Sequence, residues 1–170
     1  MSLYWEEKDT TSMKTWLKKL PSSKLLVILS PTHRHPVRKW PGKNYIMLAN
    51  YLQKEWKASI VWLWGPGEKI DVKNLASQTN TESYLAPQTT LQEAAALIHL
   101  SDLFIGNSNG PSHLAVGVGT NSVQLHGPTQ FYSWSPATKK HRGVQSPSGK
   151  IEDIGFHAVT TEIEKILQTK

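Results

Sequence analysis

The residues best suited to chemistry lie in a short polar segment, Asn107-Ser108-Asn109-Gly110-Pro111. The apolar run Leu103–Ile105 just before it is typical of a buried strand. Pro111 favours the first position of a helix, which Gly117 and Gly119 would end. Unpaired backbone N–H groups at such a helix N-terminus, together with the helix dipole, favour an anion such as phosphate. The spacing therefore predicts an anion site where a strand ends and a helix begins.

His113 falls in the first turn of this predicted helix. The helix dipole disfavours the protonated imidazole, unless a bound diphosphate supplies compensating negative charge. A purely structural interpretation stays open, in which Asn109 caps the helix and His113 bonds to nearby backbone. A motif this short does not decide between the two by itself.

Three further motifs stand in order around this segment. They are Arg38-Lys39-Trp40-Pro41, Trp64-Gly65-Pro66-Gly67-Glu68 and Gly127-Pro128-Thr129. With the Gly-Pro segment, they resemble the carboxy-terminal, donor-binding half of the heptosyltransferase-like glycosyltransferases, glycosyltransferase family 9. The resemblance covers about residues 24 to 168, nearly the whole chain.

The resemblance implies roles for single residues near the donor's phosphates and sugar. The loop after the first strand would contribute a hydroxyl, expected from Thr32, and a basic residue two positions before Trp40, which is Arg38. An arginine at that position could grip a phosphate with two hydrogen bonds. The neighbouring Lys39 adds positive charge, whereas the histidines of this loop are expected to be ordinary solvated residues.

The resemblance also assigns Glu68 to the hydroxyls of a ribose, as an acidic residue does in dinucleotide-binding folds. The alternative is a carboxylate that interacts with the dipole of the next helix. Ser108 stands where the family commonly has an acidic residue, which leaves the donor sugar open unless Asn107 or Asn109 compensates. The candidate donor-binding residues are Thr32, Arg38, Lys39, Glu68, Ser108, Asn109, Gly110, Pro111 and His113.

Alternating strands and helices must position these residues. Apolar runs predict strands at Lys24–Leu29, Ser59–Trp64, Glu82–Leu85, Leu103–Ile105 and Ser122–Leu125. Periodicity and caps predict helices at Met13–Leu20, Trp40–Trp56 and Ile70–Gln78, after the capping box Thr90–Glu93, and around Ile163 and Ile166. Residues 130–136 are expected to form an aromatic loop, and residues 137–149 an exposed, mobile one. This pattern predicts an α/β, three-layer Rossmann-like domain with a mostly parallel sheet of about five or six strands.

Composition bounds the classes of function. The 170 residues fit a single domain, with a leading helix in 1–22 and a nucleotide-sugar-binding domain in 23–170. The net charge of +6 suits a phosphate-bearing partner. The 19 lysines and arginines are scattered, apart from Arg34, Arg38, Lys39 and Lys43, so nucleic acid is not expected. No cysteines and no metal-ligand spacing are present, so neither a metal nor a cofactor is expected. The lack of cysteines says little about the compartment, and the cytoplasm is taken as the default location.

The resemblance implies one half of a GT-B type glycosyltransferase. Its expected donor is a nucleotide-diphospho-sugar, namely ADP-heptose, and its acceptor a lipopolysaccharide-core or related glycan. A carboxylate would deprotonate the acceptor hydroxyl, which attacks the anomeric carbon with inversion, while Arg38 and the helix dipole stabilise the departing diphosphate. The family's general base and acceptor pocket lie in an amino-terminal domain absent from these residues. The isolated chain is therefore expected to be inactive.

Two other classes of function stay open. One is a non-catalytic nucleotide-binding module, which would keep the Gly-Pro site without a catalytic partner domain. The other is a nucleotide-sugar epimerase-like enzyme, which would need acid–base carboxylates near the sugar, whereas Glu68 alone stands in a site motif. A peripheral association with the inner membrane is also left open.

Overall fold

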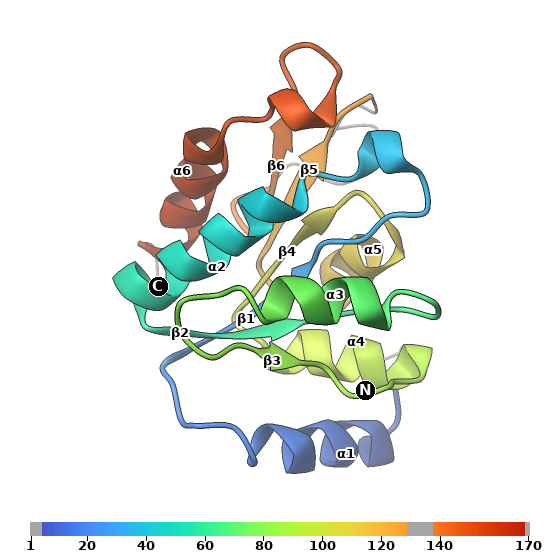
Figure 1. The fold of residues 1–170 in the computed structure, drawn as a ribbon. Helices are drawn as coiled ribbons and strands as arrows, with labels where there is room; N and C mark the ends of the chain where they lie inside the picture. Colours follow the sequence, from blue (N-terminus) through green and yellow to red (C-terminus); the bar gives the residue numbers. More distant parts are fainter. Residues whose placement is uncertain (1–4, 129–137, 169–170) are drawn as a thin grey trace.

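The computed structural model describes residues 5–128 and 138–168, and these contain one six-stranded parallel sheet (Figure 1). The strand order is β3-β2-β1-β4-β5-β6, which is that of a Rossmann-type sheet. The strands are β1 (Leu25–Ser30), β2 (Ala58–Trp62), β3 (Tyr84–Leu85), β4 (Leu103–Asn107), β5 (Ser122–His126) and β6 (His141–Gln145). The predicted α/β fold is confirmed.

Helices cover both faces of the sheet, which explains the continuous apolar runs of the central strands. One face carries α2 (Gly42–Trp56), α3 (Lys69–Ala76) and α6 (Phe156–Leu167). The other face carries α4 (Leu91–Leu100) and α5 (Gly110–Gly117), and α1 (Glu7–Leu17) packs against α4 (Figure 1). Two short turns of 3-10 helix, η1 (Pro36–Arg38) and η3 (Ile151–Asp153), lie in connecting segments. No helix in the described part of the chain has the length and apolar character needed to cross a bilayer.

Local capping fixes several helix starts. The predicted capping box is confirmed: the hydroxyl of Thr90 accepts from the Glu93 N–H, and the Glu93 carboxylate accepts from the Thr90 N–H, each at 3.0 Å. Helix α1 begins six residues before the predicted Met13, at Glu7. Its first turns are polar and give no apolar periodicity, so only the capping interaction between Glu6 and Asp9 marks their start.

The prediction of an exposed loop over residues 137–149 is wrong for β6, which pairs in parallel with β5. The strand is polar, so it lacks the apolar pattern by which strands are recognised. Its polar groups find partners instead: the Nδ1 of His141 lies 3.0 Å from the hydroxyl of Ser122, and Arg142 pairs with Glu162 on α6. The predicted aromatic loop, 130–136, and Thr129 lie outside the described residues.

Gly127, at the end of β5, is required by close packing. A Cβ atom there would lie 2.8 Å from the Cβ and 2.9 Å from the backbone nitrogen of Ile151 in η3. No larger residue fits without moving that backbone. The predicted Gly-Pro turn therefore brings η3 against the carboxyl end of the sheet.

Candidate functional site

The main cavity lies where the order of the strands reverses. The chain runs outward from β1 to β3 and then returns to the other side of β1 to form β4. The loops after β1 and β4 therefore diverge at the carboxyl edge, and ligands bind in such crevices in open α/β sheets. A pocket of about 800 Å³ occupies this position. Its walls are Ser30, Thr32, Arg34, Leu63, Trp64, Gly65, Pro66, Glu68, Thr89, Thr90, Leu91, Ala94, Asn109, Gly110, Pro111 and Leu114.

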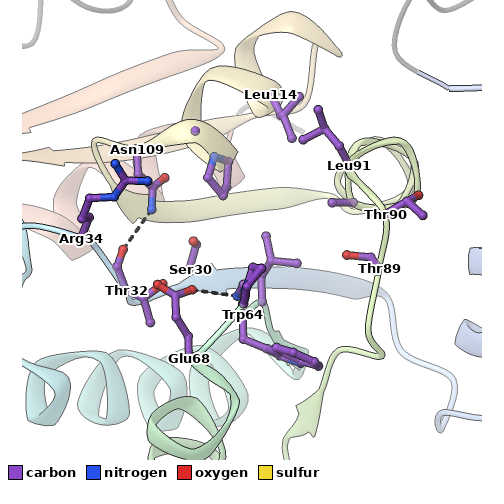
Figure 2. Close-up of a pocket in the computed structure, with 16 residues that line it drawn as sticks. Ser30, Thr32, Arg34, Trp64, Glu68, Thr89, Thr90, Leu91, Asn109 and Leu114 are labelled. Carbon is purple, nitrogen blue, oxygen red and sulfur yellow. Dashed lines mark hydrogen bonds between the residues drawn. The ribbon is translucent and has the colours of Figure 1, made fainter.

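The two ends of the pocket differ in chemistry. Figure 2 shows Arg34, Thr32 and Asn109 together on one side, and Thr89, Thr90 and Leu91 on the other. The second end is uncharged, and it combines the two threonine hydroxyls with the apolar surfaces of Leu91 and Trp64. The Nε1 of its Trp64 donates to the Ala86 carbonyl at 2.7 Å, which fixes the indole in place. A ligand with a charged part and a flat, weakly polar part would match this division.

The start of α5 forms one wall of the polar end. The Oδ1 of Asn109 accepts from the Ser112 N–H at 3.2 Å, so the predicted cap is confirmed. Gly110 lines the pocket, and a Cβ atom there would meet nothing within 4 Å. The first turn of the helix is therefore open to the cavity, where its dipole favours negative charge.

Asn107 holds the two loops together from below. Its side chain is fully buried. Its Oδ1 accepts from the Trp40 N–H at 3.1 Å and the Tyr45 hydroxyl at 2.9 Å, and its Nδ2 donates to the carbonyls of Pro31 at 3.0 Å and Thr32 at 3.3 Å. All four hydrogen-bonding positions of the amide are thus used inside the protein. The idea that Asn107 compensates for the missing acidic residue by contacting a sugar is wrong.

His33 bridges the same two loops nearer the surface. Its Nδ1 accepts from the His35 N–H at 2.9 Å, which leaves the proton on Nε2, and Nε2 lies 2.7 Å from the Ser108 carbonyl. Burial lowers the pKa of His33, the hydrogen bond to Ser108 acts against that, and the charge of Arg38 lowers the pKa further. The interpretation of His33 as a solvated loop residue is wrong, whereas His35 is exposed as expected.

Glu68 faces the polar end from the opposite wall (Figure 2). Its Oε1 accepts from the Gly65 N–H at 2.7 Å, so one carboxylate oxygen closes the turn after β2. Glu68 contributes the one carboxylate among the pocket-lining residues of the described chain. Across 5–128 and 138–168, no three His, Asp or Glu side chains gather closely enough to hold a metal ion.

The structure brings only part of the predicted site to the pocket. Thr32, Glu68, Asn109, Gly110 and Pro111 line it. Arg38 and Lys39 lie in and just after η1, Ser108 is buried with its carbonyl bonded to His33, and His113 is exposed on α5; none of these four is among the lining residues.

Arg34 lines the pocket but was not singled out from the sequence. It was one of four basic residues near the predicted site, in a loop without periodicity, so nothing local distinguished it from Arg38.

Comparisons with known proteins agree with this geometry. The model of glycosyltransferase family 9 (heptosyltransferase) matches residues 5–161. Lipopolysaccharide heptosyltransferase 1 of Campylobacter coli is 26% identical over 142 residues, which are 74% of this chain and 40% of the relative. Lipopolysaccharide heptosyltransferase 2 of Escherichia coli is 28% identical over 120 residues, 67% of this chain and 34% of the relative. The chain thus aligns with less than half of the length of these relatives.

Solved structures share the fold at low identity. A family 9 glycosyl transferase from Veillonella parvula superposes with a TM-score of 0.88 at 17% identity, over 100% of this chain and 54% of that one. An Escherichia coli heptosyltransferase with ADP gives 0.77 at 20% identity, over 91% and 48% of the two chains. A UDP-GlcNAc 2-epimerase from Methanocaldococcus jannaschii gives 0.69 at 12% identity, over 94% and 43%. Because the family model spans residues 5–161, nearly the whole chain, the chain belongs to glycosyltransferase family 9.

Proposed function

We propose that this chain is the donor-binding domain of a glycosyltransferase similar to the ADP-heptose:lipopolysaccharide heptosyltransferases. Its pocket would hold a nucleotide-diphospho-sugar. The observation that carries the proposal is the pairing, across one cavity, of an open helix N-terminus at Gly110 with the Glu68 carboxylate. The similarity to proteins named lipopolysaccharide heptosyltransferases supports the choice of sugar.

The donor would lie along the length of the pocket. The diphosphate would sit at the start of α5 beside Thr32, and the ribose hydroxyls would donate to the free oxygen of Glu68. The base would then reach the uncharged end near Trp64 and Leu91. Arg38, Lys39, Ser108 and His113 stay predictions, because they lie beside the pocket wall and would contact only a part of the donor that extends beyond it.

The chemical step needs groups that this pocket does not supply. Inverting transfer requires a base on the acceptor hydroxyl next to the anomeric carbon, and positioning alone can contribute about 7–11 kcal/mol. Within the described residues, the only pocket carboxylate is Glu68, which is assigned to the ribose. We therefore expect no transfer from ADP-heptose to a heptose-deficient core acceptor by the 170-residue chain alone. Addition of the rest of the enzyme in trans should restore it, and transfer by the chain alone would contradict the placement of the base.

A nucleotide screen tests the binding proposal. Calorimetry with ADP, UDP, GDP and CDP should favour ADP, with a dissociation constant of about 0.1–1 mM, because the pocket is open to solvent and encloses a nucleotide only in part. Glu68→Gln keeps an acceptor for the Gly65 N–H but loses the charge, so it should weaken ADP without weakening inorganic diphosphate. Glu82→Gln, at an exposed carboxylate, is the matched control. Equal weakening of ADP and diphosphate by Glu68→Gln would assign that residue to folding instead of the ribose.

The two other classes remain weaker proposals. A non-catalytic nucleotide-binding module would bind ADP as above but gain no transferase activity with any partner domain. The epimerase alternative has support only from a shared fold at 12% identity. The cytoplasmic location, the absence of nucleic-acid binding and any association with the inner membrane stay predictions.

A further inference from the structure

We propose that Arg34 is the residue that binds the diphosphate of the donor, and that His33 positions it. The inference rests on the proposed function of the pocket as a nucleotide-diphospho-sugar site. It moves the main cationic contact to the diphosphate from Arg38, the basic residue that the family resemblance implies, to a residue four positions earlier.

Arg34 is placed where it could bind an anion in this pocket. It lines the cavity with an exposed side chain, and in Figure 2 it lies on the same side of the pocket as Asn109, which caps α5. The three ion pairs of the described residues do not include it. A guanidinium offers five donors in a planar fork that matches two phosphate oxygens. An anion between Arg34 and α5 would therefore gain contacts from both.

His33 fixes the backbone on which Arg34 stands. Its Nδ1 accepts from the His35 N–H at 2.9 Å, so the ring closes a turn around Arg34. Its Nε2 lies 2.7 Å from the Ser108 carbonyl, which ties that turn to the loop after β4. On the other side, the Thr32 carbonyl accepts from Asn109 at 3.0 Å. The residues flanking Arg34 are thus held at both ends, so binding at this loop costs little backbone conformational entropy.

Arg38 offers the matched contrast. Its backbone N–H donates to the His35 carbonyl at 2.9 Å inside η1, and its side chain is not part of the pocket wall. It is close enough to His33 for its charge to lower that pKa, so both arginines belong to the same loop. Only one of them lines the cavity. A binding experiment can therefore separate a direct phosphate contact from a general effect of positive charge.

Titrations of the 170-residue chain with ADP and with adenosine, followed by amide chemical shifts, test the role of Arg34. Arg34→Gln should weaken ADP about tenfold and leave adenosine within about twofold, because only ADP carries the diphosphate. Arg38→Gln should leave both ligands within about twofold. The reverse pattern, or an unchanged ADP affinity in Arg34→Gln, would overturn the role of Arg34 and leave the proposed function of the pocket standing. If the wild-type chain bound neither ligand, the proposed function would fail and the inference with it.

A second set of variants tests whether His33 acts through Arg34. His33→Phe loses both ring hydrogen bonds and should weaken ADP about as much as Arg34→Gln does, again sparing adenosine. His33→Gln carries an amide acceptor and donor and should recover most of the loss. In the Arg34→Gln background, His33→Phe should cause no further loss, because its effect is already removed. Additive losses, or equal loss of adenosine, would overturn the positioning role.

Discussion

Replacing Asn107 by alanine should be among the most destabilising single changes in this chain. The substitution leaves the Trp40 N–H and the Tyr45 hydroxyl, both fully buried, without their acceptor. Each orphaned donor costs about 1–3 kcal/mol, so the two together should cost about 2–6 kcal/mol. A domain typically has about 5–15 kcal/mol of stability in all. The loops that form the pocket would separate as well, and ADP binding should be lost with them.

A double-mutant cycle isolates the cause. Burial raises the pKa of Tyr45 well above its usual value, so its hydroxyl stays protonated and acts as a donor at neutral pH. In the wild-type background, Tyr45→Phe removes one hydrogen bond and should cost about 1 kcal/mol. In the Asn107→Ala background it removes an orphaned hydroxyl, so it should be neutral or stabilising.

Urea denaturation followed by circular dichroism measures these free energies, provided that the slope of the transition is unchanged among variants. Asn109→Ala is the control: it removes a partly exposed amide that caps α5 and donates to the Thr32 carbonyl, so it should cost only about 1–2 kcal/mol. If Asn107→Ala cost less than about 1.5 kcal/mol, or if Tyr45→Phe cost the same in both backgrounds, the assignment of Asn107 as the central buried hydrogen-bonding group would be refuted.

Two further measurements probe the carboxyl edge of the sheet. Gly127→Ala should cost about 1–3 kcal/mol by overpacking against Ile151, whereas Gly110→Ala, with open space around it, should be neutral; urea midpoints compare them. Burial, with a further contribution from the charge of His113, lowers the pKa of His126 from 6.5 to about 4. As the pH falls, His126 is protonated in the unfolded chain at a higher pH than in the folded chain, because its pKa is higher there. The free energy of unfolding is therefore unaffected by His126 above about pH 6.5 and declines between that pH and about pH 4, by up to roughly 3 kcal/mol. His126→Gln should flatten this decline, and an unchanged dependence of the free energy of unfolding on pH would contradict the role of His126.

The sequence by itself determined the layers of the fold and the edge of the sheet at which the candidate pocket lies. Runs such as Leu25–Leu29 must be buried on both faces, which only a parallel sheet covered by helices provides. The cap at Asn109 and the capping box at Thr90 are local interactions, so their residue types suffice to predict them. For the same reason, the segment at Gly110 could be assigned to a helix start facing the carboxyl edge.

Only the tertiary structure decided which side chains face the cavity. Asn107 and Asn109 are the same residue type two positions apart, yet one is a fully buried structural group and the other lines the pocket. Arg34 lines the pocket and Arg38 does not, although both stand in one loop. The direction of that loop depends on hydrogen bonds such as that from His33 to the Ser108 carbonyl, 75 residues away. Strand β6 could not be predicted from the sequence either, since it is polar and its polar groups bind partners on other elements. Contacts between residues so far apart leave no local pattern in a sequence, and they exist only once the chain has folded.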